Sequence, residues 1–237
     1  MIDKKPIISL RNITKSYITG SAECQALKGI SLEVYKGEFV AIMGPSGSGK
    51  STTMHIIGAL DTPTSGTYTL NNKNISAYSE DQLAEIRNQE IGFVFQAFNL
   101  LPRTTVLDNV IRPMMYGRVP QNEQTERAFE CLRLVHLEDK ASNLSNHISG
   151  GQIQRVAIAR AIVMDPSMIL ADEPTGNLDS KTSHEIMTFL QDLNKKGRTI
   201  IVITHESDIA AFANRIILLK DGLIISDKEN NRFIAKK

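Results

Sequence analysis

The sequence contains no tryptophan and only two cysteines, and none of its apolar runs approaches the roughly 20 residues that a membrane-spanning helix needs. Cys24 and Cys131 are far apart and fit no metal-binding or redox spacing, which is typical of a protein in a reducing compartment. An excess of charge is also lacking, because 27 lysines and arginines stand against 26 aspartates and glutamates. This balance does not favour nucleic acid or an anionic membrane as a partner.

A glycine-rich stretch at residues 44–51 fits the pattern G-x-x-x-x-G-K-[ST] of a phosphate-binding loop. An apolar run at 39–43 precedes it, and Met54 and Ile57 follow at helical spacing, so we expect the loop to join a strand to a helix. In such a loop the backbone N–H groups surround phosphates, the lysine reaches the β- and γ-phosphates, and the last hydroxyl binds Mg²⁺. The alternative is a glycine-rich turn without a ligand. The loop residues are Gly44, Pro45, Ser46, Gly47, Ser48, Gly49, Lys50 and Ser51.

The rest of the chain alternates apolar runs with amphipathic stretches, which predicts an α/β fold. Strands are predicted at 7–13, 27–34, 37–43, 67–70, 91–96, 168–171, 199–204, 215–219 and 223–226, and helices from 51, 79, 106, 121, 149 and 180. The helix from 121 is expected to reach 138. No convincing strand occurs between 97 and 164, which predicts an all-helical insertion. Tyr17 falls in the polar loop predicted between the first two strands, where it either stacks on a nucleobase or packs on the surface.

Two adjacent carboxylates follow the apolar run at 168–171. Asp172 ends a predicted buried strand, and Mg²⁺ prefers hard oxygen ligands such as its carboxylate. Because successive side chains of a strand point to opposite faces, Glu173 is expected to serve a different partner, an attacking water molecule. The alternative is an ordinary solvated acidic pair.

A second anion site is predicted at the start of the helix at 149–164. Its exposed N–H groups belong to Ser149, Gly150, Gly151 and Gln152, far along the chain from Lys50 and on the predicted helical insertion. One copy of the chain therefore need not bring both anion sites to one nucleotide, whereas two copies arranged head to tail can. The alternative is an ordinary serine cap with flexible glycines.

Two further polar residues end predicted strands, where α/β sheets place their ligand contacts. Gln96 ends the strand at 91–96, and His205 follows the strand at 199–204. The loop at 97–102 after Gln96 carries more apolar side chains than solvent favours. It either folds onto the core or offers a docking patch, with Phe98 and Leu101 as candidate contacts.

Together these motifs resemble those of the nucleotide-binding subunits of ATP-binding cassette (ABC) transporters, over essentially the whole chain. In that family's terms, residues 44–51 resemble the Walker A motif, Gln96 the Q-loop, 149–152 the signature and 168–172 the Walker B strand. Residues 177–179 resemble the D-loop. The signature normally begins with leucine, and Ile148 stands there instead, which conserves apolar volume.

The resemblance also implies a role for each matching residue. ATP and Mg²⁺ are the implied ligands. Tyr17 stacks on adenine, Lys50 and the loop amides hold phosphates, and Thr52 and Asp179 complete the nucleotide contacts. Metal ligands are Ser51, Gln96 and Asp172, while Glu173 polarises the attacking water and His205 contacts the γ-phosphate. Ser149, Gly150, Gly151 and Gln152 of a second copy close the site.

A P-loop NTPase fold follows from the same resemblance, with a RecA-like parallel-sheet core, an N-terminal antiparallel β subdomain and an inserted α-helical subdomain. Residues 1–237 are expected to form one ABC ATPase domain, in which 97–164 is the helical subdomain and 1–96 with 165–237 the remainder. Finer similarity to the branch of MacB-like exporters and LolD-like lipoprotein-release ATPases is carried by 44–53, 58–66 and 171–179.

That branch implies an ATPase that dimerises head to tail on ATP, drives export through a separate MacB- or FtsX-like permease, and lies on the cytoplasmic face of the membrane. Nucleic acid is not an expected partner. Two alternatives remain open at this point. One is an FtsE-like ATPase that works a membrane protein without moving cargo, and the other is a soluble ABC ATPase outside transport.

Overall fold

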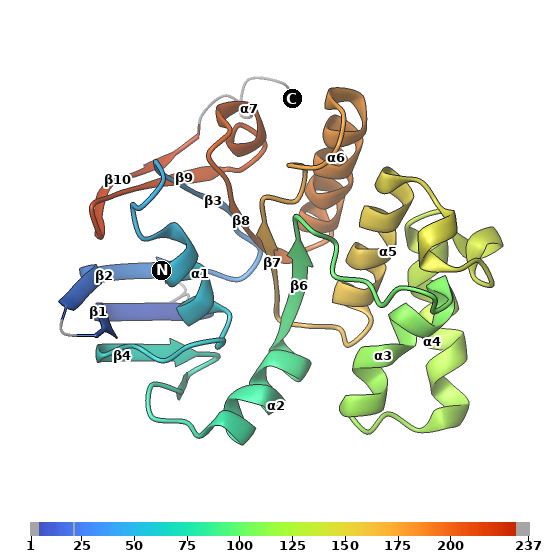
Figure 1. The fold of residues 1–237 in the computed structure, drawn as a ribbon, viewed down its shortest axis with the longest axis horizontal. Coiled ribbons are helices and arrows are strands. Elements are labelled where there is room, and N and C mark those ends of the chain that lie inside the picture. The colour runs from blue at the N-terminus through green and yellow to red at the C-terminus, as the bar shows by residue number, and fades with distance from the viewer. Residues whose placement is uncertain (1–4, 21, 231–237) are drawn as a thin grey trace. The chain divides into compact units, whose positions relative to one another are not determined.

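The structure is a computed structural model that describes residues 5–20 and 22–230. These residues form two compact units. Unit 1 comprises the residues up to 84 together with those from 191 onward, and unit 2 comprises residues 85–190. The chain passes between the units inside α2 (Glu80–Glu90) and α6 (Ser180–Lys195), which are labelled in Figure 1. The subdomain boundaries expected at 96/97 and 164/165 stay a prediction.

Unit 1 contains an antiparallel sheet with the strand order β2-β1-β4-β5. Its long hairpin pairs β1 (Ile8–Thr19) with β2 (Ala22–Val34), and β4 (Ser65–Leu70) and β5 (Lys73–Asn74) follow. Tyr17 lies within β1 opposite Cys24, so the prediction that it lies in a loop was wrong. The reason is that backbone pairing in a hairpin does not require apolar side chains. Residues 14–17 are polar, so no apolar pattern in the sequence predicts that β1 continues to Thr19.

The candidate phosphate loop follows β3, which lies between two parallel neighbours in unit 1. There β3 (Phe39–Met43) pairs in parallel with β8 (Thr199–Ile203) on one side and β9 (Arg215–Lys220) on the other, and β10 (Leu223–Glu229) closes the predicted hairpin with β9. All of β8 is buried, which explains why it reads as a continuous apolar run. Two helices accompany these strands, α1 (Lys50–Ile57) and α7 (Ser207–Ala210).

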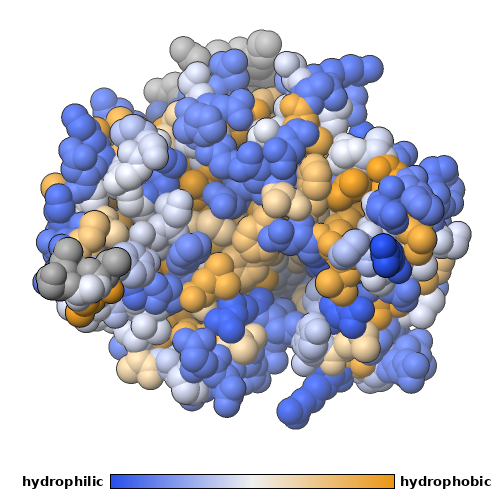
Figure 2. Space-filling model, in the orientation of Figure 1, coloured by the Kyte–Doolittle hydropathy of each residue, from blue (hydrophilic) through white to orange (hydrophobic). Residues whose placement is uncertain are grey.

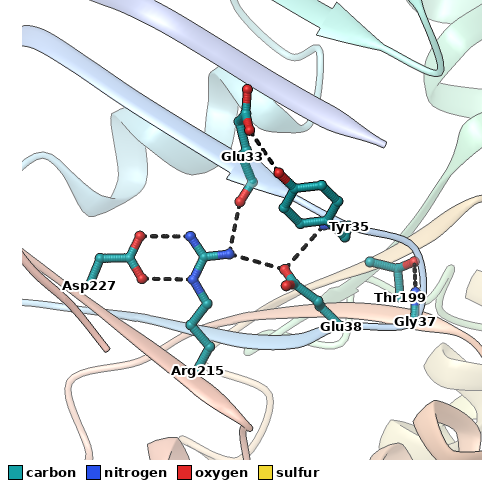
Figure 3. A network of polar contacts seen from close by, with 7 residues as sticks. All are labelled: Glu33, Tyr35, Gly37, Glu38, Thr199, Arg215 and Asp227. Atoms are coloured by element: carbon teal, nitrogen blue, oxygen red, sulfur yellow. Dashed lines mark hydrogen bonds and ion pairs between the residues drawn. The ribbon is translucent and has the colours of Figure 1, made fainter. Parts of the chain in front are cut away.

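A polar network links β2, β9 and β10 with Glu38, the residue before β3, in unit 1 (Figure 3). Arg215 of β9 donates two parallel hydrogen bonds to the carboxylate of Asp227 in β10, at 2.7 and 2.6 Å. Its remaining nitrogen donates to the Glu33 carbonyl at 2.9 Å and to Glu38 at 3.1 Å. The bonds to Asp227 outweigh burial and raise the pKa of Arg215, so the guanidinium acts as a permanently charged clamp.

Unit 2 combines two parallel strands with the predicted helical segment. β6 (Ile91–Phe95) pairs with β7 (Met168–Asp172), and between them come α3 (Val106–Tyr116), α4 (Gln121–Leu134), α5 (Gly150–Ile162) and two short 3₁₀ turns at Glu138–Lys140 and Ser145–His147. Residues 97–164 contain no strand, as predicted, apart from one isolated bridge. The prediction that α4 reaches residue 138 was wrong, because His136 takes a left-handed conformation with φ of 56° that a helix cannot continue.

A close approach between strand and helix fixes the position of α5 in unit 2. A Cβ atom added at Gly92 of β6 would lie 2.3 Å from the backbone oxygen of Ala161 in α5. Real side chains cannot come so close to backbone, so only glycine lets β6 and α5 pack at this distance. The helix that carries the second predicted anion site is therefore positioned by the strand that precedes Gln96.

The surface carries scattered apolar side chains. In unit 2 the large hydrophobic residues that are exposed are Leu101, Met115, Tyr116 and Leu134. Figure 2 shows hydrophobic residues at the surface among hydrophilic ones on the helical side of the view. Within the described ranges, no helix has both the length and the apolar character that crossing a bilayer requires.

Candidate active site

In unit 1 the loop at 44–51 joins β3 to α1, as predicted, and its glycines are required by the space around them. A Cβ atom at Gly44 would lie 2.3 Å from the Leu219 oxygen. At Gly49 the φ is 100°, and a Cβ atom would lie 2.8 Å from Leu27 and 2.9 Å from the backbone oxygen of Ala26. The loop is therefore folded tightly against its neighbours, and glycine is needed at both positions.

Several polar groups of this loop are suited to an anion. Lys50 Nζ donates to the carbonyls of Gly44 at 2.6 Å and Pro45 at 2.9 Å, so its ammonium is held against the loop. Gly49 is the N-cap of α1 and provides no side-chain cap, which leaves the first N–H groups of the helix available. The buried Oγ of Ser48 has no hydrogen-bond partner. These donors and the helix dipole fit a chain of phosphates.

Most of the other loop residues face outward. Pro45, Ser46, Gly47 and Ser51 are exposed, and Thr52 is half-buried. His205 is also exposed and follows β8, whose end is joined to β3 because the Thr204 N–H donates to the Ile42 oxygen at 3.1 Å. Unit 1 thus places His205 after the strand that pairs with the strand leading into the loop. Tyr17 of β1 is 37% exposed.

In unit 2 Gln96 and Asp172 come from neighbouring strand ends, since Phe95 lies opposite Asp172 in the parallel pair. Gln96 contacts the turn after β7, because a Cβ atom at Gly176 would lie 2.6 Å from its Nε2. The Asn177 amide donates to the Gln96 carbonyl at 2.8 Å. Gln96 and Asp172 thus lie at adjacent strand ends, and their role as ligand contacts stays a prediction.

Glu173 does not continue the strand. Its φ is 43°, in the left-handed region that non-glycine residues rarely adopt. The expectation that it diverges from Asp172 as the next residue of an extended strand was therefore wrong. Instead Glu173 begins a turn, in which its carbonyl accepts the Gly176 N–H at 3.1 Å. The turn, rather than the alternation of a strand, sets the direction of this carboxylate.

The predicted helix start at 149–152 is confirmed as the N-terminus of α5. Ser149 is its N-cap, where the hydroxyl accepts the Gln152 N–H at 3.4 Å and the Gln152 side chain accepts the Ser149 N–H at 3.0 Å. Ser149 and Gly150 are exposed, whereas Gly151 packs closely on Thr182. The serine cap and an exposed glycine amide thus occur together.

Asp179 caps the helix that follows. Its carboxylate accepts the Thr182 N–H at 2.9 Å and the Thr182 hydroxyl at 2.7 Å. These bonds hold the pKa of Asp179 below its ordinary value. Thr182 therefore contacts both Asp179 and the tip of α5.

Two residues of α5 that the sequence reasoning missed hold the loops around Gln96. The fully buried Gln154 donates to the Pro174 carbonyl at 2.5 Å, and Arg160 donates to the carbonyls of Asn99 at 2.5 Å and Phe98 at 2.9 Å. Burial lowers the pKa of Arg160. A signal for Gln154 was present, because it interrupts an otherwise apolar face with Ala157 and Ala161.

The candidate residues form two groups, one in each unit. Tyr17, residues 44–52 and His205 belong to unit 1, and Gln96, residues 149–152, Asp172, Glu173 and Asp179 belong to unit 2. Among the residues that the structure describes, no three histidine, cysteine, aspartate or glutamate side chains gather as a metal site.

A family model for ABC transporters matches residues 27–176, which include the loop at 44–51, Gln96 and the tip of α5. The chain belongs to the ABC transporter family. The ABC transporter ATP-binding protein YvrO of Bacillus subtilis (strain 168), itself described as uncharacterized, is 53% identical over 95% of this chain and 98% of its own length. The macrolide export ATP-binding/permease protein MacB of Chlorobaculum tepidum is 51% identical over 94% of this chain. That match covers 34% of MacB, so the chain spans about a third of this relative.

Solved structures agree with the family. A dimeric, post-hydrolysis structure of the ATP-binding cassette MJ0796 bound to ADP and Pi matches with a TM-score of 0.85 and 47% identity, over 94% of this chain and 98% of that one. The P-loop NTPase fold with an antiparallel β subdomain is therefore confirmed. The chain is an ATP-binding ABC ATPase.

Proposed function

We propose that this ABC ATPase is the ATP-hydrolysing subunit of a MacB-like transporter and drives export or extrusion through a separate membrane permease. Several MacB proteins are about half identical to this chain, including those of Chlorobaculum tepidum and Campylobacter fetus. By this proposal the subunit lies on the inner face of the cell membrane, held there by the permease. The proposal does not include nucleic acid as a partner.

In unit 1 the loop amides, Lys50 and Thr52 hold the phosphates of ATP, and Tyr17 stacks on the adenine. The observation that carries the proposal is the loop itself, in which glycines without space for a Cβ, the Lys50 ammonium and the open N-terminus of α1 occur together. Such a cradle favours a multiply charged phosphate chain over a single carboxylate, because several N–H donors and one cation act on it at once.

Oxygen ligands of the kind that Mg²⁺ prefers are provided by Ser51, Gln96 and Asp172. When bound with ATP, Mg²⁺ neutralises negative charge on the phosphate oxygens. Asp172 suits this role, since it ends a buried strand that pairs with the strand before Gln96. A hydroxyl, an amide and a carboxylate are each chemically suited to a hard cation.

Hydrolysis depends on Glu173 and His205. The carboxylate of Glu173 orients the attacking water and accepts its proton, and the imidazole of His205 contacts the γ-phosphate. The left-handed backbone of Glu173 supports its assignment as the base, because strained conformations of non-glycine residues cluster at functional sites.

A second copy of the chain completes each site by supplying Ser149, Gly150, Gly151 and Gln152, and Asp179 adds a nucleotide contact. Two observations support this arrangement: Ser149 and Gly150 are exposed at the N-terminus of α5, and a similar cassette forms a dimer with bound ADP and Pi. ATP shared by two copies draws them together, and product release lets them part.

The loop at 97–102 passes this motion to the permease, with Phe98 and Leu101 as contacts. Leu101 is 44% exposed, and Arg160 fixes the loop through the carbonyls of Phe98 and Asn99. An apolar side chain held in a defined conformation at the surface suits docking of a partner helix or loop.

The test is the association state of Glu173→Gln, which keeps the volume of the side chain but removes the base. With ATP and Mg²⁺, size-exclusion chromatography with light scattering should show a dimer that wild type forms only transiently. The double variant Glu173→Gln, Gly150→Val is the control and should stay monomeric. A Glu173→Gln protein that remains monomeric with saturating ATP contradicts the paired mechanism. Failure to co-purify with any membrane protein contradicts the transport assignment.

A further inference from the structure

Tyr17 is held in a polar cluster by Lys15 and Asp61, two residues to which the sequence assigned no role. Its hydroxyl donates to Asp61 Oδ2 at 3.1 Å, and Lys15 Nζ donates to Asp61 Oδ1 at 2.6 Å. The Lys15 ammonium also lies over the Tyr17 ring, 5.1 Å from its centroid. One carboxylate and one cation thus act on the same aromatic side chain from two directions.

Asp61 is itself fixed by the backbone around it. It follows the end of α1, where its N–H donates to the His55 carbonyl at 3.2 Å, and its Oδ1 accepts the Thr62 N–H at 2.7 Å. The next residues are tied to β1, because the Thr64 N–H donates to the Thr14 carbonyl at 2.9 Å. α1 begins at Lys50 and has eight residues, a rise of about 12 Å. One short helix therefore connects the phosphate loop to the anchor of Tyr17.

Lys15 completes the anchor from the strand that carries Tyr17. Its side chain is only 13% exposed, and its ammonium donates to the Thr62 carbonyl at 2.8 Å as well as to Asp61. A partly buried cation with two strong acceptors has little freedom to move, so its position over the ring is fixed. An ammonium over a ring face is attracted by the ring quadrupole and resists rotation of the ring away from it.

We propose that Asp61 and Lys15 are positioning residues that hold the Tyr17 ring as the platform for the nucleobase of ATP. The inference rests on the proposed contact between Tyr17 and adenine and adds the two residues that preorganise it. Tyr17 keeps 37% of its surface exposed, so a fixed ring remains open to a stacking partner. A ring that is already fixed loses less side-chain entropy on binding than a free one, and this difference appears as affinity.

The competing explanation is that the cluster only fastens the loop at 61–64 to β1. The two explanations differ in what they predict for a ligand without a base. If the two residues position the ring, their removal should change the affinity for ATP but not for inorganic tripolyphosphate. Tripolyphosphate presents a similar phosphate chain to the loop but has no base to stack on Tyr17. If the cluster only holds the loop at 61–64 on β1, its removal should lower the affinities for ATP and tripolyphosphate together, through α1, or should lower stability alone.

The experiment is calorimetric titration of the full chain with ATP and, separately, with sodium tripolyphosphate, both with EDTA so that hydrolysis does not interfere. Stacking of a base on an aromatic ring contributes roughly 5- to 150-fold in affinity. Tyr17→Ala should lose most of that factor for ATP. Asp61→Asn and Lys15→Met should each weaken ATP several-fold and leave tripolyphosphate unchanged, with a smaller loss for Tyr17→Phe, which removes only the hydroxyl.

Asp227→Asn is the matched control, because Asp227 also accepts strong bonds from one cation in unit 1 but belongs to the strand clamp of Arg215. It should leave the ratio of the two affinities at the wild-type value, even if stability falls.

If Asp61→Asn and Lys15→Met weaken the binding of both ligands equally or of neither, while Tyr17→Ala weakens the binding of ATP alone, the positioning role is wrong and the adenine contact stands. If Tyr17→Ala itself leaves the ratio unchanged, the proposed adenine contact fails and the positioning role fails with it. Tripolyphosphate binding alone then supports the phosphate loop. Tyr17→Phe keeps the test valid should Asp61→Asn fold poorly.

Discussion

The phosphate loop of unit 1 and the strand ends of unit 2 present their polar groups in different ways. In the loop most groups belong to the backbone, and glycines at 44 and 49 let that backbone pack where no Cβ fits. In unit 2 the groups are side chains, Gln96, Asp172 and Glu173, displayed at strand ends and in a turn. The binding properties of a site built from backbone groups depend mainly on backbone geometry. Those of a site built from side chains depend mainly on which side chains are present. Changes in the first should act on binding and changes in the second on turnover.

Glu173→Gln should produce the largest separation of these two effects. The amide keeps the size of the side chain but cannot accept a proton, so we expect turnover of ATP to fall by about 10²- to 10⁴-fold. ATP affinity, measured by fluorescence of a labelled analogue, should stay within a few-fold of wild type. Glu126→Gln, an exposed glutamate of α4, is the control and should change neither. An unchanged hydrolysis rate in Glu173→Gln excludes this carboxylate as the base.

Lys50→Ala should show the opposite pattern in unit 1. Loss of the charge-assisted bonds to phosphates, each contributing about 1.5–3 kcal/mol, should weaken ATP by about 10- to 100-fold. Tripolyphosphate should weaken by a similar factor, since the lysine acts on phosphates and not on the base. Lys73→Ala, an exposed lysine of β5, should leave both affinities at their wild-type values. Unchanged affinity in Lys50→Ala contradicts the assignment of the phosphate loop.

The same contrast explains what the sequence could predict. The loop at 44–51, the buried strands β3, β7 and β8, and the start of α5 each follow from a local pattern of glycine, apolar or capping residues. The extent of the β1–β2 hairpin did not follow, because residues 14–19 pair through the backbone with residues 22–28, while the side chains at 14–17 are mostly polar.

Two further features were out of reach. The left-handed conformation of Glu173 belongs to a turn that Gly176 closes, and an apolar strand pattern does not show at which residue the strand gives way to a turn. Asp61 lies 46 positions from Lys15, and although the similarity at 58–66 includes Asp61, no pattern in the sequence relates the two residues. Their relation to Tyr17 appears only when β1 and the end of α1 are folded together.

Gly92→Ala should test whether backbone geometry also matters in unit 2. The new Cβ would lie 2.3 Å from the Ala161 oxygen, so β6 and α5 must separate. We expect a loss of about 1–3 kcal/mol in the free energy of unfolding, measured with urea, and little change in tripolyphosphate affinity. Gly150→Ala is the matched control for stability, because a Cβ atom there would lie 3.5 Å from Leu178 Cδ2, an ordinary van der Waals contact. Equal destabilisation by the two substitutions would contradict a specific β6–α5 contact.

The smallest effect expected is the pH dependence that Asp61 gives to stability. Burial raises its pKa, but the hydrogen bonds from Lys15, Thr62 and Tyr17 outweigh this and hold the pKa below its ordinary value. Because the folded pKa is below the unfolded one, near 3.9, the stabilisation is fully present above about pH 4 and is lost as the pH falls through the folded pKa. The difference in thermal midpoint between wild type and Asp61→Asn should therefore be constant near neutral pH and shrink in acid. In a Lys15→Met background the difference near neutral pH should be smaller, since the strongest partner of the ionised carboxylate is gone. A difference that grows in acid, or that Lys15→Met leaves unchanged, contradicts an ionised Asp61 held by Lys15.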